Sequence, residues 1–214
     1  MTEPTQLLTQ KFISAIAASR ERGQFADPTL SHDSGSFKVH RFVVCISSKF
    51  FQKVCTAGFE ERSTGVVNLN DVPFLLLDKL VQFLYNMDYE DVLPADTDDS
   101  LLKLHAKMFA LADRFDIPDL LLVAASKYSV RCLTSWEPIE FLASIRDVYK
   151  GTPPSLSSLR RAAYTAIRKN LPAMLDDETV LKRYDQTVTE NPDFAQDLLR
   201  SYVTDPIFMR CYTL

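Results

Sequence analysis

The chain has 214 residues, of which 46% are hydrophobic and 11% aromatic. A chain of this length and composition can bury a hydrophobic core without help from disulfides or metal ions. Its formal net charge of −4 gives no overall attraction to nucleic acid or to anionic membranes, so we expect neither as a partner.

The N-terminal sequence and the cysteines both indicate an intracellular protein. The first 24 residues lack the basic start, continuous apolar segment and cleavage site of a secretory signal, and no apolar run approaches the ~20 residues that span a bilayer. The cysteines are scattered without a C-x-x-C pair, as expected for thiols in a reducing compartment. We therefore expect a soluble protein of the cytoplasm, the nucleus or both.

The first predicted element is an amphipathic helix from residue 5 to residue 22. Leu8, Phe12 and Ile16 recur at helical spacing, and Gly23 is placed to end the helix. This apolar stripe either packs on the chain's own domain or is offered to a partner.

Short strands and short helices are predicted next. Residues 25–30 and 37–39 predict a hairpin, because the turn signal Asp33-Ser34-Gly35-Ser36 separates them. From Arg41 the apolar spacing becomes helical, and Ser47-Ser48 can cap a second short helix. Residues 66–69 predict a further short strand.

The rest of the chain predicts helices only. A helix follows Pro73, and later helices are expected over residues 101–115, 120–132, 138–150, 156–171 and 177–203, with Pro172 and Pro192 as breakers. A basic face in this tail is expected to be solvated; it consists of Arg160, Arg161, Arg168 and Lys169. Strands in the front half followed by helices indicate an α+β fold with a helical tail.

An acidic stretch lies between Asn86 and Ser100. It holds six acidic residues and no basic one: Asp88, Glu90, Asp91, Asp96, Asp98 and Asp99. Like charges without counterions favour a solvated loop. A calcium site is the more specific alternative, but the stretch lacks the alternating oxygen ligands and central glycine of a calcium-binding loop.

His40 and Cys45 raise the question of a cysteine nucleophile with its base, or of half a metal site. Cys45 lies in the apolar run Val-Val-Cys-Ile, where we expect it to fill the core as a protonated, inert thiol. With Cys55 they supply three candidate zinc ligands, but in no familiar pairing. Phosphate-binding and hydrolase motifs are also missing. We expect no catalysis, metal or cofactor, and keep a cysteine hydrolase using His40 and Cys45 as a distant alternative.

The ordered motifs between residues 25 and 132 resemble the BTB/POZ domain. They include F-K-V-H-R-x-V-V-C-x-x-S-x-F-F at residues 37–51, G-F-x-E at residues 58–61 and L-A-D-x-F-x-I-P at residues 111–118. The pattern looks most like that of BTB proteins from filamentous fungi. The resemblance implies the BTB/POZ fold, a small short-stranded sheet capped by a helical cluster, followed here by an all-helical C-terminal extension.

The resemblance also divides the chain. Residues 1–24 correspond to an N-terminal amphipathic helix that is a dimer element in dimeric members, residues 25–132 to the BTB/POZ domain, and residues 133–214 to the helical extension. It implies an interaction module and no enzyme. His40 takes the place of a packing and hydrogen-bonding residue at a strand-to-helix corner.

Three sets of partner-binding residues follow from the resemblance. Phe59, Glu60 and Glu61 occupy the place of a cullin contact. The alternative is that Phe59 packs into its own domain and Glu61 is only solvated. Asp27 and Arg41 occupy the charged pocket at the floor of a dimer, or pair within one domain. Leu8, Phe12 and Ile16 are the expected dimer interface.

These features predict a BTB-type interaction module that self-associates as a homodimer. It would act as a substrate adaptor for a cullin-RING ubiquitin ligase, with an unidentified client protein bound by the helical tail. A dimeric scaffold or transcriptional co-regulator without cullin binding is the alternative.

Overall fold

The computed structural model describes residues 3–56, 64–153 and 155–204, which fall into two compact units. Unit 1 comprises residues 1–92 and 110–123, and unit 2 comprises residues 93–109 and 124–214. Two helices, α6 (Leu101–Arg114) and α7 (Pro118–Thr134), contribute residues to both units. The division into residues 1–24, 25–132 and 133–214 stays a prediction.

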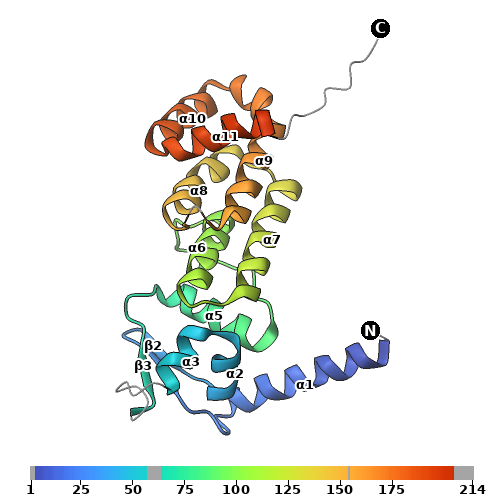
Figure 1. Ribbon diagram of the computed structural model, residues 1–214, viewed down its shortest axis with the longest axis vertical. Coiled ribbons are helices and arrows are strands. Elements are labelled where there is room, and N and C mark those ends of the chain that lie inside the picture. Colours follow the sequence, from blue (N-terminus) through green and yellow to red (C-terminus); the bar gives the residue numbers. More distant parts are fainter. Residues whose placement is uncertain (1–2, 57–63, 154, 205–214) are drawn as a thin grey trace. The chain divides into compact units, whose positions relative to one another are not determined.

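Unit 1 contains a three-stranded sheet in the order β2-β1-β3 (Figure 1). Strand β1 (Thr29–His32) pairs antiparallel with β2 (Gly35–Lys38) and parallel with β3 (Val66–Asn68). The predicted hairpin is confirmed. Its first strand begins at Thr29 instead of Phe25, because Phe25 has a φ of 57°, which an extended strand does not allow.

Helix α1 (Glu3–Glu21) ends where the sequence predicts. Gly23 adopts a left-handed φ of 64°, and its N–H donates to the carbonyl of Arg20 at 2.9 Å. The next N–H, of Gln24, reaches back to the carbonyl of Ser19 at 3.0 Å. This pair of bonds satisfies carbonyls in the last turn of the helix, as glycine commonly does at this position.

The core of unit 1 lies around α2 (Arg41–Ser47), α3 (Lys49–Thr56) and α5 (Phe74–Asn86). Ser48 caps α3 as predicted: its hydroxyl accepts from the N–H of Phe51 at 3.1 Å and donates to the carbonyl of Phe115 at 2.5 Å. The rings of Phe50, Phe51 and Phe115 pack with centroids 5.0–5.2 Å apart. The cap therefore joins α2 and α3 to the segment after α6.

The regular secondary structure of unit 2 is all helical in the part of the chain that the structure describes. It holds its share of α6 and α7 with α8 (Pro138–Lys150), α9 (Ser157–Leu175), α10 (Glu178–Glu190) and α11 (Pro192–Thr204). The expected break at Pro172 is wrong, since α9 continues to Leu175. Pro172 removes one amide donor near the end of α9, but packing against α8, α10 and α11 keeps the helix intact.

Two arginines expected to be solvated are buried. Arg160 is 7% exposed and donates to the carbonyls of Tyr149 and Thr152 at 3.2 and 3.1 Å. Arg168 is 6% exposed and donates to the carbonyl of Ser201 at 2.9 Å. Each guanidinium satisfies carbonyls near a helix end, where no intrahelical donor is available. Arg161 and Lys169 are exposed, as the sequence predicts.

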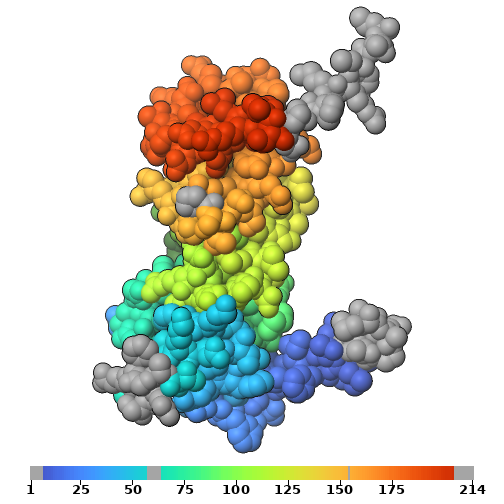
Figure 2. Space-filling model, in the orientation of Figure 1, coloured from blue at the N-terminus to red at the C-terminus, as the bar shows by residue number. Residues whose placement is uncertain are grey.

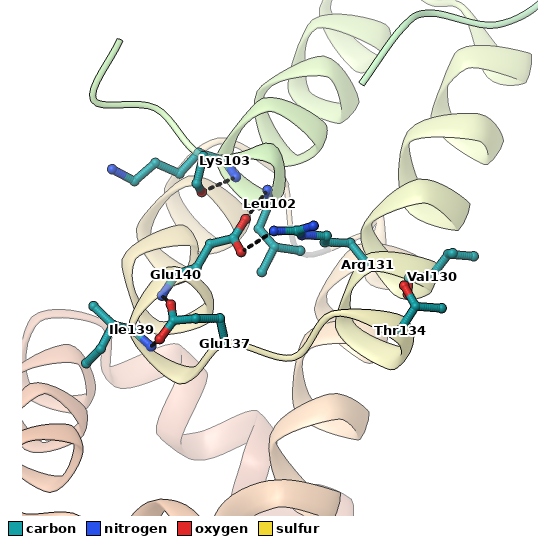
Figure 3. Close-up of polar contacts among 9 residues, drawn as sticks. Leu102, Lys103, Val130, Arg131, Thr134, Glu137, Ile139 and Glu140 are labelled. Atoms are coloured by element: carbon teal, nitrogen blue, oxygen red, sulfur yellow. Dashed lines mark hydrogen bonds and ion pairs between the residues drawn. The ribbon is translucent and has the colours of Figure 1, made fainter. Parts of the chain in front are cut away.

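Glu140 joins three helices of unit 2 (Figure 3). Its carboxylate accepts from the N–H of Leu102 at 3.2 Å, at the start of α6, and from the guanidinium of Arg131 in α7 at 3.0 Å. Glu137 accepts from the N–H groups of Ile139 and Glu140 and so caps α8. A carboxylate at the N-terminal end of α6 also interacts favourably with the helix dipole.

The acidic stretch forms an irregular segment between α5 and α6, and most of its carboxylates are exposed, as predicted. Asp99 is the partly buried member, and both of its oxygens accept from the ammonium group of Lys107 at 2.7 Å. Among the described residues, every helix is too short or too polar to cross a bilayer.

The substitution Glu140→Ala is expected to lower the free energy of unfolding by about 2–3 kcal/mol, because it leaves a helix-end N–H and the Arg131 guanidinium without their shared acceptor. Urea denaturation followed by circular dichroism measures the change. Glu90→Ala, at an exposed position, is the control and should stay within about 0.5 kcal/mol of wild type. Equal losses in the two variants would contradict the role given to Glu140.

Candidate protein-interaction surface

The N-terminal half of α1 has an exposed apolar stripe. Leu8 is 66% exposed and Phe12 is 67% exposed, whereas Ile16, one turn further, is half-buried. Figure 2 shows α1, in dark blue, projecting from the rest of unit 1. Only the C-terminal half of the helix packs on its own unit, against α5. The described residues therefore provide no complete cover for the stripe.

Helix α2 presents a second apolar face to solvent. Phe42 is 71% exposed and Ile46 is 67% exposed, while Val43 and Val44 on the other side of the helix are buried. Residues four apart lie on the same face of a helix. Helix α2 is thus apolar on both sides, and the described part of the chain covers one of them.

A groove lies between α1 and α2, with a volume of about 810 Å³. Phe25, which is 90% exposed, lines it together with residues of both helices. We name this region the α1–α2 surface and define it by its apolar residues: Leu8, Phe12, Ile16, Phe25, Phe42 and Ile46.

Hydrogen bonds between His40 and Tyr85 fix the corner from which α2 starts. The hydroxyl of Tyr85 accepts from the backbone N–H of His40 at 2.7 Å and lies 3.0 Å from its Nδ1. Nε2 of His40 lies 2.9 Å from the carbonyl of Gln24, an acceptor, so Nε2 carries the proton and Tyr85 donates to Nδ1. His40 has the contacts that a structural corner residue requires.

The same tyrosine anchors the end of α1. The guanidinium of Arg20 lies over the Tyr85 ring, 5.1 Å from its centroid. Burial raises the pKa of the Tyr85 hydroxyl, although His40 and Arg20 oppose the shift. The hydroxyl therefore stays protonated and able to donate at neutral pH. One buried side chain of α5 holds both edges of the α1–α2 surface.

Asp27 and Arg41 lie in the groove and contact each other within one chain. Nε of Arg41 is 3.7 Å from a carboxylate oxygen of Asp27. The Asp27 side chain is 72% exposed and that of Arg41 is 38% exposed, so the pair is solvated in the single chain. Arg41 also donates to the carbonyl of Cys55 at 3.3 Å. The structure brings the two predicted charges together without burying them.

The residues proposed for cysteine catalysis are not arranged for it. Both ring nitrogens of His40 are engaged by Tyr85 and Gln24, which leaves neither free to act as a base. Cys45 is half-buried, short of the full burial that we expected, because it lies beside the groove. Burial, and to a lesser degree Cys55, raises the pKa of the Cys45 thiol to about 11. A nucleophilic cysteine needs the opposite shift.

Metal binding has no geometric support in residues 3–56, 64–153 and 155–204. Within these ranges no three His, Cys, Asp or Glu side chains lie close enough to hold an ion. The predicted cullin contact, Phe59 with Glu60 and Glu61, lies outside the described residues.

Sequence reasoning missed half of the α1–α2 surface, namely Phe25, Phe42 and Ile46. A signal for the last two is present: the α2 sequence Arg-Phe-Val-Val-Cys-Ile-Ser is apolar on every side. A short helix at the edge of a domain can bury only one side, so the excess apolar residues indicate a second covering partner. Phe25 has no such signal, because its exposure depends on the left-handed turn after α1.

Comparison with known proteins identifies a family. A model of the BTB/POZ domain family matches residues 16–128. Kelch-like protein 41 of Mus musculus is 29% identical over 106 residues, which are 50% of this chain and 16% of that protein. Kelch repeat and BTB domain-containing protein 4 of Homo sapiens is 33% identical over 66 residues, 31% of this chain and 12% of that protein.

These relatives are matched over a small part of their own length. They are mammalian proteins, so they give no support to the predicted likeness to fungal members. Among solved structures, the BTB domain of zebrafish PATZ1 is 14% identical with a TM-score of 0.45, covering 58% of this chain and 93% of that one.

The alkylation rate of Cys45 by iodoacetamide is expected to rise about tenfold per pH unit between about pH 8 and about pH 10, since the reactive thiolate is the minor form below a pKa of about 11. Mass spectrometry of the Cys45 peptide follows the reaction, with free cysteine as the reference thiol. A rate that levels off below about pH 8 would reveal an activated thiolate and restore the nucleophile hypothesis.

Proposed function

The chain belongs to the BTB/POZ domain family, and on that premise we propose that it is a protein-interaction module that forms a homodimer through the α1–α2 surface. The observation that carries the proposal is the exposure of large apolar side chains from α1, from α2 and from Phe25 in the turn after α1. Soluble monomers rarely leave a contiguous apolar patch of this kind in water. A second copy of the chain supplies the missing cover.

A two-fold arrangement suits this surface because it is apolar on both the ridge and the groove. Leu8, Phe12 and Ile16 form a ridge of residues four apart along α1, and such ridges pack into grooves between neighbouring side chains. The groove beside α2 accepts the ridge of the other copy. In a C2 dimer the ridge of each copy lies in the groove of the other, so the same apolar contact forms twice.

The charged pair has a defined place in this arrangement. Asp27 and Arg41 line the groove that the second copy would cover. A charge that loses water without a partner is costly, and the existing contact between the two groups reduces that cost. The pair thus allows the groove to be covered without leaving an isolated charge.

The proposal extends to a cullin contact through Phe59, Glu60 and Glu61. Its support is the G-F-E-E sequence at residues 58–61, in the family's order after the F-K-V-H motif. A large aromatic side chain that fills a pocket of the partner is a common type of interface anchor. With a client protein held by the helices of unit 2, the chain would act as an adaptor for a cullin-RING ubiquitin ligase.

The substitution Phe12→Asp is expected to weaken self-association about a hundredfold or more, because each copy loses a buried aromatic side chain and gains a buried charge. Size-exclusion chromatography with light scattering over a range of concentrations measures the mass. Leu199→Asp, at a position 69% exposed on α11, is the matched control and should stay dimeric. A single-chain mass for wild type, or an unchanged mass for Phe12→Asp, would refute the proposed interface.

In a pull-down with purified cullin, wild type is expected to bind and both Phe59→Ala and Glu61→Lys to lose most of the binding, since they remove the apolar anchor and reverse the adjacent charge. Glu90→Lys, exposed in the acidic stretch, controls for a change in net charge. Absence of binding by wild type would leave a dimeric scaffold or transcriptional co-regulator as the function.

A further inference from the structure

A second groove lies in unit 2, between the end of α7 and one face of α9. It has a volume of about 630 Å³. Leu133 and Trp136 form one wall, and residues of α9 between Ser158 and Asn170 line the rest. We name it the α7–α9 groove.

The floor of the α7–α9 groove is made of small side chains. Ser158, Ala162 and Thr165 line it at spacings of four and three, which place them on one face of α9. Side chains of this size leave the gap between the two helices unfilled. The groove is therefore a consequence of the small side chains of α9 that face the end of α7.

The wall of the groove on the α7 side is apolar and open to solvent. Leu133 is 68% exposed, and Val130, one turn earlier on α7, is 52% exposed. Trp136 is half-buried, with its ring 4.9 Å from that of Phe141. An apolar segment laid along this wall would remove these side chains from water.

The charges around the groove have one sign. Arg161 and Lys169 line it and are exposed, and the lining residues that the structure describes include no acidic one. This local charge is opposite to the formal net charge of −4 of the whole chain. An occupant that complements the groove must be apolar on one side and carry negative charges at its edge.

The positions of the two cations also limit the shape of the occupant. Arg161 and Lys169 are eight residues apart on α9, which corresponds to about 12 Å along the helix axis. A helical segment lying along α9 would present carboxylates at this separation when they are about seven or eight residues apart.

We propose that the α7–α9 groove binds an acidic amphipathic helix of a protein partner, whose apolar face covers Leu133 and Trp136 and whose carboxylates pair with Arg161 and Lys169. Helix-in-groove recognition requires an apolar trough with polar contacts at its rim, and both are present here. The inference rests on the proposed role of the helices of unit 2 as the part that holds a client, and it gives the chemistry of that client.

Nucleic acid fits the groove less well than a helix does. Binding to a phosphate backbone depends on many cationic contacts, whereas the groove presents two exposed cations beside an apolar wall. An exposed apolar wall gains from contact with an apolar face.

The groove carries its own reporter, because Trp136 is the single tryptophan of the chain. The probe is a synthetic helical peptide of about 16 residues without tryptophan, with leucines on one face and two glutamates about seven residues apart. Titration into the full chain is expected to give a saturable change in tryptophan fluorescence. Anisotropy of a fluorescein-labelled copy of the peptide confirms the affinity independently of Trp136.

Charge exchange tests the assignment of the cations. The double variant Arg161→Glu with Lys169→Glu is expected to bind the acidic peptide at least about tenfold more weakly, and to bind a peptide with lysines in place of the glutamates better than wild type does. The matched control, Arg146→Glu with Lys150→Glu on exposed positions of α8, should bind the acidic peptide as wild type does. Leu133→Glu should weaken binding through the apolar wall.

The inference is overturned if wild type shows no saturable binding of the acidic peptide, if the double variant binds it as wild type does, or if a DNA duplex binds more tightly than the peptide. The state of self-association and cullin binding are measured on the same wild-type protein. If the groove binds no acidic peptide while the protein still self-associates and binds cullin, the inference is wrong and the proposed dimer and cullin contact stand.

Discussion

The hydrogen bonds of Tyr85 determine the geometry on which the proposed function depends. This side chain of α5 is 3% exposed, holds the backbone and ring of His40 through its hydroxyl, and supports Arg20 on its ring. The end of α1 and the start of α2 are therefore attached to the same point. Leu8 and Phe12, described side chains in the N-terminal half of α1, lie away from this anchor and are exposed. The attachment of α1 to Tyr85 near its C-terminal end is thus consistent with the exposure of the stripe in its N-terminal half.

Local rules predicted most of unit 1, and they were insufficient where distant residues decide. Gly23 and Ser48 were identified because each acts on backbone groups a few residues away. The burial of Arg168 could not be predicted, since its acceptor at Ser201 lies 33 residues away in the sequence. For α1, periodicity shows that one face is apolar and leaves open what covers it. The stripe and the Asp27–Arg41 pair were found from sequence, whereas Phe25, Phe42 and Ile46 were not.

The two surfaces differ in whether a copy of the same chain can occupy them. The α1–α2 surface offers an apolar ridge and an apolar groove with a balanced charge pair, so it is complementary to itself. The α7–α9 groove has only positive charges at its described rim, and these would repel the same groove of a second copy. The proposed self-association and the proposed capture of another protein thus involve different units, and the two surfaces differ in charge pattern.

The continuity of α6 and α7 through both units limits how this protein can be divided or recombined. The family match ends at residue 128, yet Tyr128 is fully buried and its hydroxyl lies 2.8 Å from that of Ser144 in α8. A fragment ending there would expose the aromatic ring and leave the hydroxyl without that partner. The segment that matches the BTB/POZ family therefore cannot be cut from the following helices without losing this packing. Grafting a different tail onto it would require a new helix that rebuilds the pocket around Tyr128.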